Sequence, residues 1–237
     1  MTAIGSTPAK GSSSKMKRGL VASALAIRAM SGYVIQNIYT QLLAVTPIEQ
    51  DQSIQEIMKA GVMEANHAIL THALGGGTTL TAVLIFGDQL TFAHVGDSRA
   101  YLVKNNSVDI FTKDHSLVKR LEELGQITAE EAATHPQRNV LYRALGQGEP
   151  LEPDIFTAPL PQGGHLMLCS DGLWGLVTQE NILELVNSSA SPQLACKKLI
   201  ESANAAGGPD NISAILIKLP GEINEDPRTE PDLPKYQ

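Results

Sequence analysis

Three aspartates, Asp97, Asp171 and Asp210, each have a glycine within two residues and each border a run of strand-forming residues. Taken singly, each predicts a turn, because Asp and Gly are both common in turns. If the three were brought to one rim of a sheet, their carboxylate oxygens would suit Mg²⁺ or Mn²⁺. The residues alone therefore leave two interpretations open, three turns or a divalent-metal centre.

Other catalytic chemistries lack their motifs. The six histidines form neither an H-E-x-x-H motif nor a Cys/His cluster, which disfavours zinc. The sequence has no Gly-x-Ser-x-Gly nucleophile elbow and no Walker-type phosphate loop. It also lacks the D-x-D-x-D-G loop of a calcium module. Hydrolysis by metal-bound water needs none of these motifs.

Composition predicts one globular domain. The chain has 237 residues, of which 43% are hydrophobic, enough for one sizeable core. Its formal net charge of -7 and the lack of a Lys/Arg stripe exclude a nucleic-acid binder that works by phosphate neutralisation. The two cysteines, Cys169 and Cys196, show no C-x-x-C spacing. We therefore expect a reducing, cytoplasmic location.

The N-terminal part predicts a tail followed by two helices. Residues 1–19 contain no acidic residue and are rich in Ser, Gly, Thr and Lys, so we expect a flexible basic tail. Residues 15–27 imitate a signal peptide, but Arg28 interrupts the apolar run and no membrane span is expected. Apolar residues spaced by three or four predict antiparallel helices over residues 20–44 and 51–73.

Strands and further helices follow. Three runs of β-formers over residues 79–103, separated by Gly-Asp turns, predict an antiparallel meander. Helices are expected at 114–124, from the capping box at Thr128, and after Ser191-Pro192. Residues 166–169 and 212–219 are expected to be strands, and 135–146 a loop. Residues 220–237, Pro-rich and mostly acidic, are expected to be a disordered tail.

Six motifs carry a family resemblance. They are Gly-Thr-Thr from residue 77, Val-Gly-Asp-Ser-Arg-Ala-Tyr from 95, Asp-His-Ser-Leu-Val from 114, His-Pro-Gln-Arg-Asn from 135, Cys-Ser-Asp-Gly-Leu from 169 and Gly-Pro-Asp-Asn-Ile-Ser from 208. In this order they resemble the motifs of the metal-dependent protein serine/threonine phosphatases of type 2C, in their compact bacterial branch. The resemblance covers residues 19–219. It implies an α+β fold of two packed antiparallel β-sheets with helices on both outer faces, an αββα sandwich, over residues 20–219.

The resemblance also implies a mechanism and a site. Two divalent ions, Mn²⁺ or Mg²⁺, would hold a bridging hydroxide that attacks phosphorus in line. Asp171 and Asp210 would bind the first ion, and Asp97 with Asp171 would hold a third, weaker one. Residues 124–145 would form a mobile flap that brings Arg138, Asn139 and Arg143 to the substrate.

The chain departs from this pattern at its N-terminus. The family begins with a strand region that carries a phosphate-binding Arg, an acidic ligand and an Asp-Gly pair whose Asp bridges both metals. None of these stands before the helix expected at residue 20, so the domain is expected to lack its first quarter. Two alternatives follow, a start assigned too late or a degenerate protein. As written, the chain is expected to turn over substrate poorly or not at all.

Two functions of different classes follow from these features. The first is a protein phosphatase that removes phosphate from phosphoserine and phosphothreonine and opposes bacterial kinases of eukaryotic type. The alternative is an inactive remnant that binds phosphoproteins or regulates a partner. The sequence does not predict the physiological substrate, the choice of metal or the oligomeric state.

Overall fold

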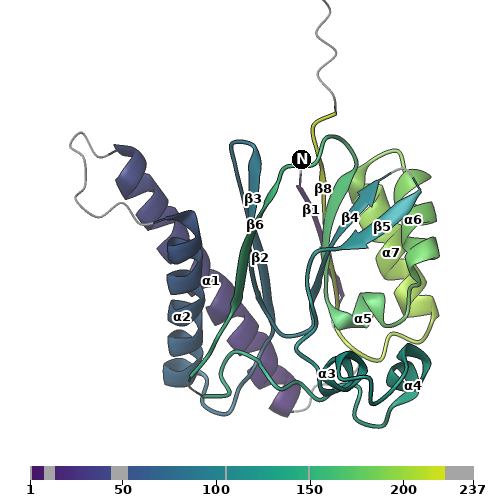
Figure 1. Cartoon of the computed structure of the whole chain (residues 1–237), viewed down its shortest axis with the longest axis horizontal. Coiled ribbons are helices and arrows are strands. Elements are labelled where there is room, and N and C mark those ends of the chain that lie inside the picture. Colours follow the sequence, from purple (N-terminus) through teal and green to yellow (C-terminus); the bar gives the residue numbers. More distant parts are fainter. Residues whose placement is uncertain (1, 8–13, 44–52, 105, 149, 222–237) are drawn as a thin grey trace, which may run out of the picture.

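The computed structural model describes residues 2–7, 14–43, 53–104, 106–148 and 150–221. Two antiparallel sheets pack face to face, and helices cover both outer faces (Figure 1). A five-stranded sheet has the order β1-β8-β7-β4-β5, and a three-stranded sheet the order β2-β3-β6. This is the αββα sandwich that the resemblance predicted.

Two long helices cover the smaller sheet, formed by β2 (Leu80–Phe86), β3 (Gln89–Val95) and β6 (Asp154–Pro159). Helix α1 (Ser14–Leu43) packs along α2 (Ile54–His72), whose first turn is closed by a capping box between Ser53 and Glu56. Small and apolar residues of α1 and α2 bury a core with the outer face of β3. Both helices were predicted, with slightly different ends.

The larger sheet is formed by β1 (Thr2–Thr7), β4 (Arg99–Lys104), β5 (Ser107–Ile110), β7 (His165–Cys169) and β8 (Ile212–Lys218). Helices α5 (Asp171–Trp174), α6 (Gln179–Asn187) and α7 (Pro192–Ala205) cover its outer face. Between the sheets, Phe92 stacks on Phe156 with ring centroids 4.7 Å apart. The strands expected at 166–169 and 212–219, and the helix after Ser191-Pro192, are all confirmed.

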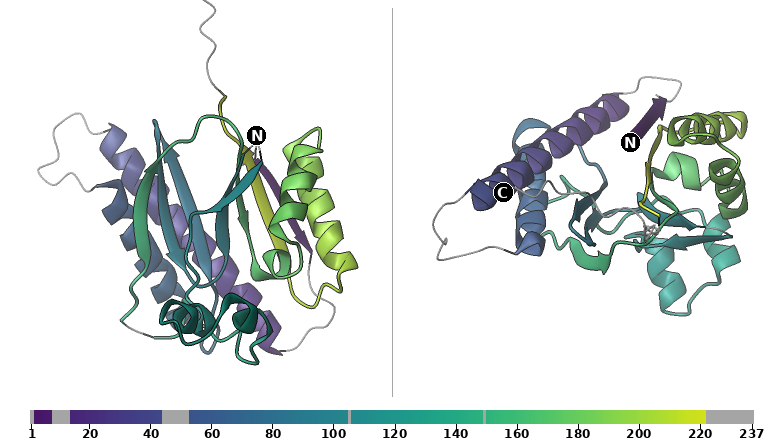
Figure 2. Two further views of the ribbon diagram at one scale, coloured as in Figure 1. Left: turned by 45° about the vertical axis from the view of Figure 1, so that its right-hand side comes forward. Right: turned by 90° about the horizontal axis from the view of Figure 1, so that it is seen from above.

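Two short helices lie at one end of the sandwich, close to α5 (Figure 2). Helix α3 (Leu117–Glu123) begins at Ser116, and α4 (Ala129–Thr134) begins with the predicted capping box at Thr128. Neither helix buries a residue. Residues 135–146 contain no helix or strand, as predicted for a loop.

The predicted meander is wrong at its second turn. β2 and β3 form a hairpin, but β4 pairs with β5 and β7 in the other sheet. The Gly96–Asp97 step is therefore a crossing between sheets. Alternation identifies a strand but carries no information about its partner, which is set by packing between distant segments. Strand β6 and helices α5 and α6 had no predicted counterpart.

The predicted flexible tail at residues 1–19 is also wrong for the residues that the structure describes. Thr2–Thr7 pair with β8, from Thr2 opposite Ile217 to Thr7 opposite Ile212. The free edge of β8 offers unpaired backbone groups, and a segment of small β-compatible residues satisfies them. Helix α1 already begins at Ser14 because Lys15, Met16 and Lys17 are good helix formers. Of the predicted C-terminal tail, residues 222–237 lie outside the described residues.

The expectation that the chain has no membrane span stays a prediction. Residues Arg18–Thr40 form a helix long and apolar enough, by length and composition, to cross a membrane. The charge at Arg28 ended the apolar run considered in the sequence, but apolar residues resume after it at Met30, Val34 and Ile35. The same test is passed by core helices and by signal sequences, and one side of α1 packs on α2.

Candidate active site

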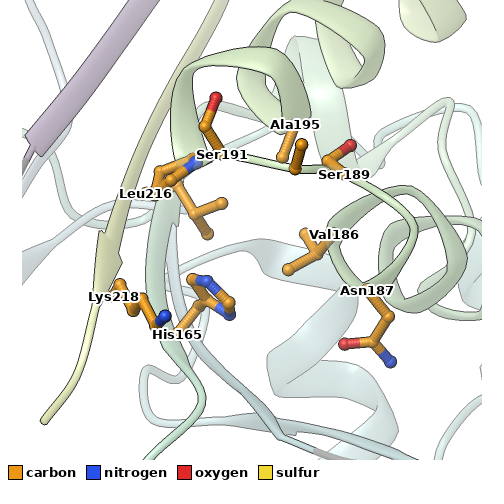
Figure 3. A pocket seen from close by; sticks show the side chains of 10 residues that line it. His165, Val186, Asn187, Ser189, Ser191, Ala195, Leu216 and Lys218 are labelled. Carbon is orange, nitrogen blue, oxygen red and sulfur yellow. The ribbon is translucent and has the colours of Figure 1, made fainter.

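Two cavities border the larger sheet and its covering helices. The smaller, about 170 Å³, lies between the outer face of β7 and β8 and the helices α6 and α7 (Figure 3). It is lined by His165, Lys218 and small or apolar residues, and no carboxylate lines it. The larger, about 710 Å³, contains Asp97, Asp171 and Asp210 together with residues from α3, α4 and α5. The three predicted aspartates therefore meet in one place.

Asp97 is held where the chain crosses from one sheet to the other. Gly96 before it has a φ of +110°, and a Cβ at this position would collide with the side chain of Thr79. Only glycine adopts such a conformation readily. The Asp97 carbonyl accepts a hydrogen bond of 2.9 Å from the Trp174 indole N–H, and Asp97 is only 8% exposed. The crossing and the indole together fix Asp97 at the rim of both sheets.

The hydroxyl of Ser170 joins the two backbone segments that carry Asp171 and Asp210. Ser170 Oγ donates to the carbonyl of Asn211 and accepts from the N–H of Ser213, both at 3.0 Å. Gly172 lies so close to the Asn211 carbonyl that a Cβ would overlap with it. The end of β7, which bears Asp171, therefore packs directly on the turn that bears Asp210.

Burial and neighbouring carboxylates raise the pKa of Asp97 and of Asp171. Burial, followed by the charge of Asp171, raises the pKa of Asp97 to about 7. Burial and the charge of Asp210 raise the pKa of Asp171. Negative charge is therefore concentrated here without a matching cation from these residues.

The nearest arginine is already paired. Arg99 donates to both carboxylate oxygens of Asp114, at 2.9 and 2.7 Å, and its guanidinium carbon lies 3.6 Å from the centroid of the Trp174 ring. Arg99, Asp114 and Trp174 all line the cavity. Sequence reasoning assigned them no role, although the first two stand within the motifs that carry the resemblance.

The three residues predicted to contact the substrate do not all line the cavity. Arg138 and Asn139 line the cavity. Arg143 is not among its lining residues and donates to Asp154 on β6 at 2.9 Å. Its prediction as a substrate contact conflicts with this placement, because the ion pair with Asp154 holds the guanidinium away from the lining of the cavity.

The donor set suits a hard divalent cation, although it is incomplete. Within the described ranges, no group of three or more His, Cys, Asp or Glu residues is arranged to hold a metal ion. The electrostatic coupling links Asp97 with Asp171 and Asp171 with Asp210, which makes two pairs that share one member. Carboxylate pairs supplemented by water are the usual ligands of Mg²⁺ and Mn²⁺.

Comparisons with known proteins agree on one family. The family described as "Protein phosphatase 2C" matches residues 10–212. The serine/threonine phosphatase stp of Listeria welshimeri is 38% identical over 204 residues, which are 85% of this chain and 79% of that protein. The protein phosphatase PhpP of Streptococcus pneumoniae is 39% identical over 151 residues, 64% of this chain and 61% of that protein.

Solved structures give the same result. The serine/threonine phosphatase PstP/Ppp of Mycobacterium tuberculosis superposes with a TM-score of 0.79 at 31% identity, covering 93% of this chain and 98% of that one. The catalytic domain of the protein phosphatase PstP in complex with two manganese ions superposes with a TM-score of 0.76 at 28% identity, with the same coverage.

Proposed function

Since the chain belongs to the protein phosphatase 2C family and is a protein serine/threonine phosphatase, we propose that the cavity of about 710 Å³ is its catalytic site. Asp97, Asp171 and Asp210 would hold divalent cations, Mn²⁺ or Mg²⁺, with Asp171 shared between the two pairs. Nothing in the comparisons favours the alternative of an inactive phosphoprotein-binding remnant.

The observation that carries this proposal is the convergence of three carboxylates in a cavity where two of the three basic lining residues are already paired. A phosphate monoester brings further negative charge to Asp97, Asp171 and Asp210. Among the basic residues described along this cavity, Arg99 is paired with Asp114 and Lys119 with Glu122, whereas Arg138 has no carboxylate partner. A phosphate group therefore needs cations to enter.

Divalent cations bound at these carboxylates would lower the pKa of a water molecule and neutralise the phosphoryl oxygens. The chain's own residues supply the rest of the site. The Ser170 hydroxyl and the Trp174 indole fix the backbone that carries the three carboxylates. Arg138, which also lines the cavity, would orient the phosphoryl group.

The substrates and location are proposed from the same features. PhpP and stp are named as phosphatases of proteins or of serine and threonine, so phosphoproteins made by bacterial kinases of eukaryotic type are the proposed substrates. Arg138 and Asn139 belong to residues 124–145 and line the cavity, which supports contact between this segment and a bound peptide. Neither Cys169 nor Cys196 forms a disulfide and both are buried, which supports a cytoplasmic location.

The experiment is phosphate release by the purified full chain from matched phosphoserine, phosphothreonine and phosphotyrosine peptides. With Mn²⁺ we expect release from the first two, loss of release on chelation, and recovery when Mn²⁺ is restored. Release that survives chelation, or that is confined to phosphotyrosine, would contradict the proposal. The expectation of poor turnover stays a prediction, and the rate in the same assay tests it.

A further inference from the structure

A buried polar cluster lies behind the turn that carries Asp97. The Gly96 N–H donates to His115 Nδ1 at 3.1 Å, and the His115 N–H donates to the Gly96 carbonyl at 2.7 Å. Both backbone polar groups of Gly96 are therefore bonded to one residue. His115 is only 1% exposed, so neither bond has water as a ready substitute.

The hydrogen bonds define the tautomer of this ring. A backbone N–H can only donate, so His115 Nδ1 must carry a lone pair. The ring proton is then on Nε2, which donates to Asp154 Oδ2 at 3.1 Å. Arg143 Nη1 lies 3.3 Å from Nε2, but both groups are donors in this tautomer, and Nη1 donates instead to the other oxygen, Asp154 Oδ1, at 2.9 Å. Asp154 thus accepts from both neighbours and holds the proton of His115 on the nitrogen that faces away from Gly96.

The same residues join the turn to the end of residues 124–145. The Tyr142 N–H donates to the His115 carbonyl at 3.0 Å, and the Leu117 N–H donates to the Val140 carbonyl at 2.8 Å. Arg143 follows Tyr142 directly, and its guanidinium forms an ion pair with Asp154. Burial lowers the pKa of His115, which favours the neutral ring that this arrangement requires.

We propose that His115 is a positioning residue for Asp97, held as its Nε2–H tautomer by Asp154 and Arg143, and that it links the Gly96–Asp97 turn to the C-terminal end of residues 124–145. This inference rests on the proposed catalytic site, because positioning Asp97 matters for function only if Asp97 acts there. In the other tautomer the His115 Nδ1–H would face the Gly96 N–H. These two donors would repel each other and move the Asp97 carboxylate.

The first experiment reads the tautomer without metal or substrate. In ¹⁵N spectra of the histidine rings of the full, metal-free chain, His115 is expected to show a protonated Nε2 and an unprotonated Nδ1. In Asp154→Asn, which removes the charged acceptor, the Nδ1 signal and the Gly96 amide proton are expected to shift. A protonated Nδ1 in the unchanged chain would overturn the proposal whether or not the chain is active.

The second experiment distinguishes the two hydrogen bonds of the His115 ring, at Nδ1 and at Nε2. His115→Asn keeps an acceptor near the place of Nδ1, and His115→Gln keeps an amide near the place of Nε2. Half-maximal Mn²⁺-induced stabilisation is expected to need about tenfold more Mn²⁺ in His115→Gln. His115→Asn is expected to stay within about threefold of the unchanged chain. His67→Gln, the same change at an exposed position on α2, serves as the matched control.

Catalysis should follow the same order. We expect kcat/KM for p-nitrophenyl phosphate at fixed Mn²⁺ to fall about tenfold in His115→Gln and to recover in His115→Asn. Melting temperatures without metal are expected to fall in both variants, so they report only the cost of changing a buried ring. Equal losses of Mn²⁺ response in both variants, or none in His115→Gln, would overturn the positioning role. If the unchanged chain itself shows no Mn²⁺ response, the proposed site fails, and the ring spectra decide the tautomer separately.

Discussion

Gly96 is the residue on which the position of Asp97 depends most directly. Its φ of +110° and its contact with Thr79 leave no room for a side chain. We expect Gly96→Ala to lower the free energy of unfolding by about 2 kcal/mol or more. Gly87→Ala is the control, since Gly87 also has positive φ but nothing lies near its Cβ position, and about 1 kcal/mol is expected. Urea unfolding measures both, and equal losses would contradict the steric role of Gly96.

His94 gives a residue-level prediction about pH. Its Nε2 lies 3.0 Å from the Lys113 carbonyl, and burial is the main cause that lowers the pKa of His94 to about 4. The unfolded chain titrates near pH 6.5 and so binds more protons than the folded chain between these values. Stability from His94 is therefore complete above about pH 6.5 and is lost as the pH falls toward 4, by at most about 3 kcal/mol.

Urea unfolding of the unchanged chain and of His94→Gln between pH 7 and 5 tests this expectation. The difference between the two curves isolates His94 from Asp97, whose raised pKa acts in the opposite direction by stabilising the fold at lower pH. The loss on acidification is expected to be smaller in His94→Gln. Parallel curves would show that His94 does not titrate in this range.

Among the elements, α3 and α4 differ from the strands in how they are held. Neither helix buries a residue, whereas three of the five residues of β7 are buried and β7 lies between two paired strands. Amides of Ala129–Thr134 are therefore expected to exchange at least about a hundredfold faster than those of His165–Cys169. Hydrogen exchange followed by mass spectrometry measures this ratio, and equal protection would contradict a mobile flap.

The element scale also shows where sequence reasoning succeeded. Helix starts at Thr128 and Ser191 were predicted because capping is a local interaction, and each side chain accepts a backbone N–H. The helix expected from residue 114 begins only after the cap at Ser116. The pairing of strands was not predicted. The crossing at Gly96 depends on β4 pairing with β7, which lies some sixty residues later in the chain. β6 was missed because it is short, half-exposed and ends at Pro159.

At the scale of the whole molecule, the αββα layers followed from the resemblance, and the meeting of Asp97, Asp171 and Asp210 followed from their motifs. The contacts that hold these aspartates in place could not be predicted from the sequence. Trp174 reaches the carbonyl of Asp97, and Arg99 stacks on the same indole, across about seventy-five residues of chain. No local pattern encodes such contacts, since they arise only when the two sheets close. The place of Thr2–Thr7 beside β8 was missed for the same reason.

The central claim is that the cavity bounded by these three aspartates carries out metal-dependent phosphate hydrolysis. The most direct test is initial-rate phosphate release from a phosphothreonine peptide, at saturating Mn²⁺, by the unchanged chain, Asp171→Asn and Asp88→Asn. Asp88 is an exposed aspartate in the β2–β3 turn and is the matched control. We expect Asp88→Asn to retain the rate of the unchanged chain and Asp171→Asn to lose about a hundredfold or more. Undiminished, Mn²⁺-dependent release by Asp171→Asn would contradict the assignment of the site.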